Sequence, residues 1–127
     1  MKLLKKGDKT IALIFDGKFE EGTHGLTGPE LPLQIISLNY KKGRVWPLHI
    51  HKPLRRVTNR LLEPFFLLSG KVKFQIFLDS ELFEEIHLVG GQGILLLEGA
   101  PRIEAEEDVV ALEFKNGPYL EDKVILE

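Results

Sequence analysis

The feature that most constrains the fold is a two-residue alternation of side-chain character at Lys71–Leu78. One face of an extended chain would carry only apolar residues, namely Val72, Phe74, Ile76 and Leu78. The opposite face would be mostly polar, with Lys71, Lys73, Gln75 and Phe77. A helix repeats every 3.6 residues and does not produce this pattern. The alternation therefore predicts a β-strand with one face in a core.

Turn signals divide the rest of the chain into similar short runs. We predict further strands at Ile11–Phe15, Leu33–Tyr40, Pro64–Leu68, Leu82–Val89, Ile94–Leu97 and Val109–Phe114. Ser69-Gly70 and Asp79-Ser80 are each predicted to form a hairpin turn on either side of the alternating strand. No segment sustains the apolar spacing of an amphipathic helix. The fold class indicated is all-β, as a sandwich or a barrel.

The length of 127 residues predicts one domain, 1–127, and 43% hydrophobic residues suffice for one core. Within it we expect an N-terminal strand and a Gly/Pro-rich arm over 1–32, a barrel core over 33–116 and a C-terminal tail over 117–127.

Charge and cysteine content exclude several function classes. The formal net charge is −2, from 17 Lys and Arg against 19 Asp and Glu, so no global field attracts nucleic acid or an anionic membrane. There is no cysteine, so any metal must be bound by His, Asp, Glu, main-chain oxygen or water. The N-terminus turns charged after two leucines, unlike a signal peptide, and the apolar runs are too short to span a bilayer. We therefore expect a cytoplasmic protein.

Two histidines and a glutamate form the candidate site. His49 and His51 are two residues apart, so an extended chain projects both imidazoles from one face. Glu63 begins an apolar run in which Phe65 and Leu67 share its face, which predicts a carboxylate at the rim of an apolar interior. The alternative is that the histidines are polar residues of a loop and Glu63 a surface carboxylate.

Together with two glycines, these residues resemble the first motif of the cupin family. Gly43, His49, His51, Glu63 and Gly70 occur in the family's order and with its flanking spacings. The stretch from His51 to Glu63 is longer than usual, and we expect a longer hairpin over Lys52–Leu62. The resemblance implies a double-stranded β-helix, or jelly-roll, barrel. It also implies a divalent transition metal (Mn, Fe, Ni or Zn) bound by His49, His51 and Glu63.

The second cupin motif is matched only in part. Gly91 and Gly99 stand at its glycine positions, whereas Leu97 and Arg102 replace its proline and histidine. A register shifted by one residue puts Pro101 at the histidine position instead. Two histidines and one carboxylate still make a facial triad. The loss of the third histidine is expected to weaken metal binding, and an inward-pointing Arg102 would weaken it further.

A narrower resemblance suggests the ligand. The run Ala111–Tyr119, and an arginine in the long gap, Arg56, are similar to small cupins associated with surface-polysaccharide biosynthesis. This likeness implies a sugar or nucleotide-sugar context. Arg56 and Arg60 are four residues apart and are expected to bind the anionic part of such a ligand, although a solvated hairpin would carry the same charges. Trp46 is a candidate stacking surface and Arg102 a candidate ligand contact.

Three functions remain open on the sequence. The leading hypothesis is a metal-binding cupin that takes a small polar, sugar-derived ligand. The enzyme alternative is a metal-independent sugar-nucleotide isomerase or epimerase in which His49 or His51 acts as acid and base, since an imidazole titrates near neutrality. The third is a degenerate cupin that binds a ligand without catalysis. In each case a homodimer is expected, because barrel folds protect exposed sheet edges by closure or pairing.

Overall fold

The computed structural model describes all residues, Met1–Glu127, and contains ten β-strands and no helix. The strands are β1 (Lys2–Lys6), β2 (Lys9–Phe15), β3 (Gly22–Gly25), β4 (Ile36–Asn39), β5 (Pro64–Ser69), β6 (Lys71–Leu78), β7 (Glu81–Val89), β8 (Gly93–Leu96), β9 (Ala100–Ala105) and β10 (Val110–Glu113). The predicted all-β class is confirmed. No helix is long and apolar enough to cross a membrane.

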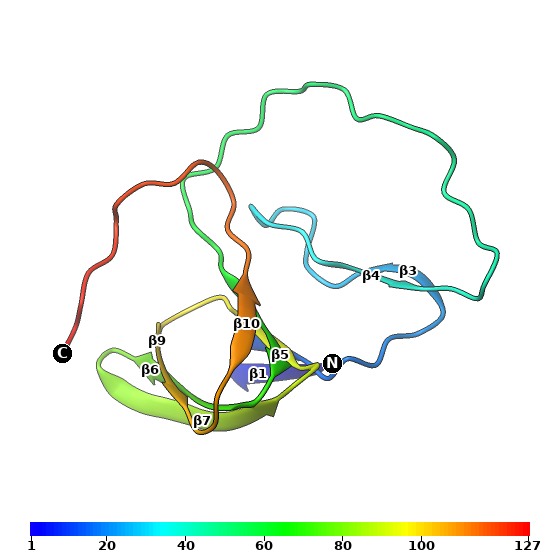
Figure 1. Cartoon of the computed structure of the whole chain (residues 1–127). Coiled ribbons are helices and arrows are strands. Elements are labelled where there is room, and N and C mark those ends of the chain that lie inside the picture. The colour runs from blue at the N-terminus through cyan, green and yellow to red at the C-terminus, as the bar shows by residue number, and fades with distance from the viewer.

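The strands form three antiparallel sheets rather than one closed barrel. The largest has the order β1-β2-β8-β5-β10, the second the order β7-β6-β9, and β3 and β4 pair separately. Figure 1 shows the two larger sheets next to each other, with β9 and β10 each at a sheet edge. The closed jelly-roll barrel expected from the sequence is not found: the two larger sheets are not joined by strand pairing, and residues 40–63 form no strand.

The main core lies between the five-stranded and three-stranded sheets. It contains buried side chains from both, namely Leu4, Ile11, Ala12, Leu67, Val72, Phe74, Ile76, Leu88 and Ile94. The alternation in β6 is confirmed, since Val72, Phe74 and Ile76 are buried while the residues between them are only partly buried. Burial of a large apolar side chain contributes roughly 1.5–3 kcal/mol, so this layer is the main source of stability.

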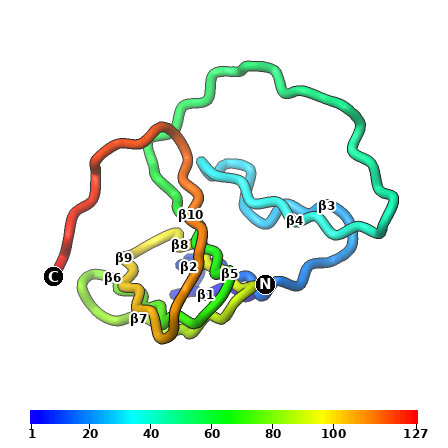
Figure 2. The backbone as a smooth tube through the Cα atoms, viewed as in Figure 1, coloured from blue at the N-terminus to red at the C-terminus, as the bar shows by residue number.

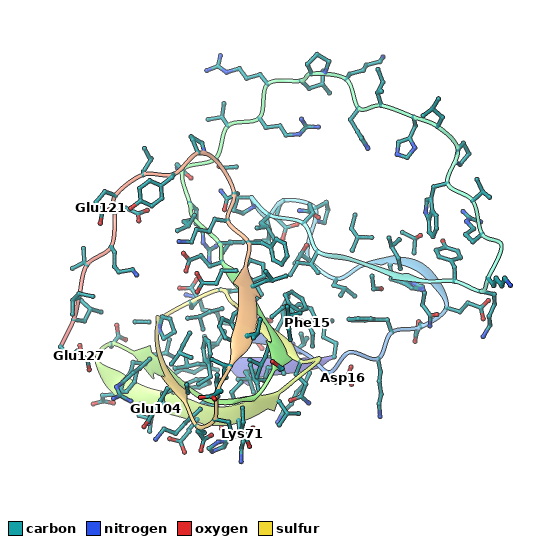
Figure 3. The ribbon with its side chains drawn as sticks, in the orientation of Figure 1. Phe15, Asp16, Lys71, Glu104, Glu121 and Glu127 are labelled. Atoms are coloured by element: carbon teal, nitrogen blue, oxygen red, sulfur yellow. The ribbon has the colours of Figure 1, made fainter.

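A second apolar layer covers the opposite face of the five-stranded sheet. Leu13, Phe15 and Leu95 are buried there together with Leu62, which precedes β5. The segment between β2 and β4 supplies the cover, with Phe19, Leu26, Leu31, Leu33 and Ile35. Phe15 is the last residue of β2 and is labelled in Figure 3 together with Asp16, which follows it.

The two predicted hairpins have different outcomes. Asp79 and Ser80 both have positive φ, 48° and 66°, and join the paired strands β6 and β7, which confirms the turn. Ser69-Gly70 is not a hairpin, because β5 and β6 belong to different sheets. Gly70 forms a corner with φ 92°, where an added Cβ would lie 2.2 Å from the carbonyl oxygen of Asp108. The glycine is required there because its chain crosses between sheets at close approach to another backbone.

Several strand boundaries also differ from the prediction. The strand expected at Leu33–Tyr40 is limited to Ile36–Asn39, and β1, β3 and β9 were not predicted. β1 contains three lysines in five residues and β9 contains a proline, so neither shows a clear β pattern. Both lie at sheet edges, where charged residues and proline are tolerated.

Residues 41–61, which we call the histidine loop, stand away from the sheets. Figure 2 shows this segment as a wide loop between β4 and β5, and every residue in it is exposed. The hairpin expected over Lys52–Leu62 is therefore absent. The loop is held at its C-terminal base, where Asn116 accepts a hydrogen bond from the backbone N–H of Leu62 (2.9 Å) and donates one to the carbonyl of Arg60 (3.0 Å).

Candidate functional site

A cavity of about 600 Å³ lies between the two larger sheets, at the base of the histidine loop. Its walls come from different strands, with Phe65 on β5, Phe74 on β6, Leu96 on β8 and Ile103 on β9. Four charged side chains also line the cavity, namely Arg60, Glu63, Glu98 and Glu113. A cleft of this size that combines aromatic and aliphatic side chains with polar groups from several strands is typical of a small-molecule site.

Glu63 lines this cavity, immediately before β5, which agrees with its predicted place at the rim of an apolar interior. Its carboxylate lies 2.9 Å from the ammonium of Lys115. The hydrogen bond to Glu63, and then the charge of Glu63, raise the pKa of Lys115 above its usual value. The carboxylate is therefore compensated by a cation rather than free in the cavity.

The two arginines predicted to bind an anion are in different places. Arg60 lines the cavity, and its guanidinium donates a hydrogen bond to the carbonyl of Leu97. Arg56 is on the exposed histidine loop and contacts only the nearby carbonyl of Leu54, at 3.5 Å. The guanidiniums of Arg56 and Arg60 are not brought together in the cavity.

Two further carboxylates in the cavity were missed by the sequence prediction. Glu98 follows β8 and forms an ion pair with Lys9 at 3.3 Å. Glu113 ends β10 and has no ion pair within the chain. A signal for Glu113 was present, because it shares a strand face with Ala111, which packs against the main core.

His49 and His51 lie together on the histidine loop, with ring centroids 5.5 Å apart and an interplanar angle of 78°. Nδ1 of His49 lies 2.6 Å from the carbonyl oxygen of Pro47, so a proton on that nitrogen makes a hydrogen bond. Both side chains are exposed and neither lines the cavity. No three His, Asp or Glu side chains are arranged to hold a metal ion, so His49 and His51 do not meet Glu63 here.

Trp46 is also on the histidine loop, outside the cavity. Its ring meets that of Tyr40 edge to face at 5.2 Å, and the guanidinium of Arg44 lies 5.7 Å from its centre. The arginine lies closer to Tyr40, at 4.6 Å, which makes the group a cation–π cluster. The guanidinium of Arg44 thus already lies over the Trp46 ring, where a ligand was predicted to stack.

Adjacent residues of β9 face opposite sides of the three-stranded sheet. Pro101 lines the cavity, whereas Arg102 pairs with Gln75 across the strands and forms ion pairs with Glu104 (3.6 Å) and Glu127 (3.7 Å). Of the two alignments considered for the second motif, the one that uses Pro101 places that position toward the cavity. Arg102 is not a lining residue.

No family model matches the chain, and no match is found among curated proteins or solved structures.

Proposed function

We propose that this protein binds a small, polar, sugar-derived ligand in the cavity between its two larger sheets. The observation that carries this proposal is the cavity itself, about 600 Å³ in volume and lined by residues of five different strands. Small-molecule sites typically occupy roughly 300–1,000 Å³ and combine apolar walls with a few convergent polar groups.

The lining suits a sugar derivative. Phe65 and Phe74 offer apolar surface to the C–H faces of a sugar ring. The carboxylates of Glu63, Glu98 and Glu113 accept hydrogen bonds from hydroxyl groups, and Arg60 is the one lining cation suited to a phosphate or carboxylate on the ligand.

We also propose that the fold is of the cupin type. The glycines that match the two cupin motifs all have positive φ, between 87° and 97°, namely Gly43, Gly70, Gly91 and Gly99. At Gly99 an added Cβ would lie 2.4 Å from the carbonyl oxygen of Phe77, so the position is restricted to glycine for the same reason as Gly70. These geometric requirements support the motif match, which spacing alone had suggested.

A second candidate function is the binding of one divalent transition metal by His49, His51 and Glu63. It is favoured by the close pair of exposed imidazoles and by the position of Glu63, which directly follows the loop that carries them. Metal binding would require the loop to approach Glu63 and Lys115 to release it. Histidine acid–base chemistry on a ligand in the cavity would require the same approach, because no histidine lines the cavity.

The ligand proposal is tested by a thermal-shift screen with sugar phosphates and nucleotide sugars. We expect at least one of them to stabilise the wild type and to lose about ten- to a hundred-fold in affinity with Arg60→Ala, since a charge-assisted hydrogen bond contributes roughly 1.5–3 kcal/mol. Arg56→Ala is the matched control and should retain the affinity. An equal loss in both variants would argue for general electrostatics, and no shift with any compound would refute the anionic part of the ligand.

A further inference from the structure

The histidine loop exposes more apolar surface than a free loop would normally carry. Ile50 is 91% exposed and Leu48 fully exposed, and several other apolar side chains of the loop are at least 65% exposed, namely Val45, Leu54 and Val57. Exposed apolar side chains gathered on one segment favour an interaction site.

The charge of this loop is of one sign. Residues 41–61 contain seven Lys and Arg, and no Asp or Glu. The cations are Lys41, Lys42, Arg44, Lys52, Arg55, Arg56 and Arg60, and none of them forms an ion pair within the chain. The surface is thus both apolar and strongly basic.

A complementary surface lies along β10, which is one of the two edge strands of the five-stranded sheet. We call it the β10 face and define it by Glu107, Asp108, Val110, Leu112 and Phe114. Its three apolar side chains are about half exposed, at 57%, 47% and 51% in that order. Glu107 and Asp108 have no ion pair within the chain. Unpaired strand edges with apolar side chains need cover.

The basic and acidic surfaces lie at opposite ends of the molecule. The histidine loop is held next to Arg60 and Asn116, beyond the C-terminal end of β10, whereas the acidic residues precede that strand. Figure 3 shows Glu104, which begins the same acidic stretch, on the side of the molecule away from the loop. A two-fold axis can place the basic end of each molecule against the acidic end of the other, so that both pairs of surfaces meet at once.

We propose that two copies of this chain form a dimer in which the histidine loop of each packs on the β10 face of the other. The loop has 21 residues, and a standard interface uses roughly 20–30 residues on each side. Its midpoint is about ten residues from either end, so it reaches up to about 35 Å from its base, enough to cross to a second copy.

This proposal is independent of the ligand proposal. It competes with metal binding by His49, His51 and Glu63 of one chain, because a loop packed on a second copy does not approach its own Glu63. In an extended segment Leu48 and Ile50 project from one side and His49 and His51 from the other. Packing of the apolar side on a second copy leaves both imidazoles available. The dimer is read out as mass and the other two proposals as ligand or metal binding, so each can fail separately.

The test uses charge reversal on both surfaces and light scattering coupled to size exclusion. The wild type should be a dimer. Arg55→Glu/Arg56→Glu and Glu107→Lys/Asp108→Lys should each weaken it by at least about tenfold, because each juxtaposes like charges. Lys5→Glu/Lys6→Glu, which makes the same charge change on β1, should remain a dimer, and circular dichroism should show that all variants are folded.

Mixing the two charge-reversed variants tests whether the histidine loop of one chain meets the β10 face of a second chain. In a mixed dimer both contacts are complementary again, so an equimolar mixture should recover dimers that neither variant forms alone. A mixture that stays monomeric would mean that the two surfaces do not meet in the dimer, and it would overturn the proposal. A monomeric wild type, or charge-reversed variants as dimeric as the wild type, would also overturn the proposal.

Discussion

The ammonium of Lys115 lies 2.9 Å from the carboxylate of Glu63, at the edge of the cavity. Lys115 follows β10, whereas Glu63 precedes β5, the neighbouring strand of the sheet. The pair of strands thus places a cation directly on the carboxylate that was predicted to bind a metal. Lys115 and a metal ion would compete for the same oxygen atoms.

Removal of this lysine should increase metal affinity if Glu63 is a ligand. In Lys115→Gln we expect manganese or nickel to bind more tightly by a modest factor, because only a weak, solvent-exposed ion pair is removed from Glu63. Titration of the purified protein measures the change. Lys123→Gln, a lysine of the C-terminal tail without an ion pair, is the control for loss of charge.

The histidine requirement is tested in the same titration. His49→Ala/His51→Ala should abolish metal binding both in the wild type and in Lys115→Gln. If the double variant binds metal as the wild type does, or if Lys115→Gln changes nothing relative to its control, the metal hypothesis for His49, His51 and Glu63 fails.

A third histidine should strengthen metal binding only from the cavity side of β9. Pro101 lines the cavity and Arg102 faces away, so Pro101→His should tighten manganese or nickel binding and Arg102→His should not. The two substitutions are adjacent and introduce the same side chain, which makes each the control of the other. Tighter binding from Arg102→His alone would mean that the strand presents its other face to the metal.

Phe74 connects the cavity to the stability of the fold. It is 3% exposed in the main core and also lines the cavity, so Phe74→Ala should cost about 3–5 kcal/mol of unfolding free energy. That is a large part of the roughly 5–15 kcal/mol expected for one domain. Urea denaturation measures it, with Phe77→Ala on the opposite face of β6 as control. Equal losses in the two variants would contradict the assignment of faces.

Local pattern was sufficient to predict much of the fold. The alternation at Lys71–Leu78 and the turn at Asp79-Ser80 identified the β6–β7 hairpin, because both signals depend on neighbouring residues. Which sheet each strand joins was not predictable in this way. Ser69-Gly70 has the composition of a hairpin turn but forms a corner between sheets, since the choice depends on packing with distant residues such as Asp108.

The candidate site was predictable to a similar extent. Glu63 lines the cavity beside Phe65, a residue of the strand face that could be read from the sequence. The positions of His49 and His51 depend on where a long loop lies, which periodicity does not determine. Lys115, more than 50 residues from Glu63 in sequence, is brought there only by the pairing of β5 with β10.

The most direct test of the account is to fill the cavity and measure ligand binding by calorimetry. Ile103 points into the cavity, whereas Arg102 beside it points away, so tryptophan at each position is a matched pair. With a sugar phosphate or nucleotide sugar that binds the wild type, Arg102→Trp should retain the affinity and Ile103→Trp should lose it. Retained binding in a folded Ile103→Trp protein would contradict the claim that the ligand occupies the space between the sheets.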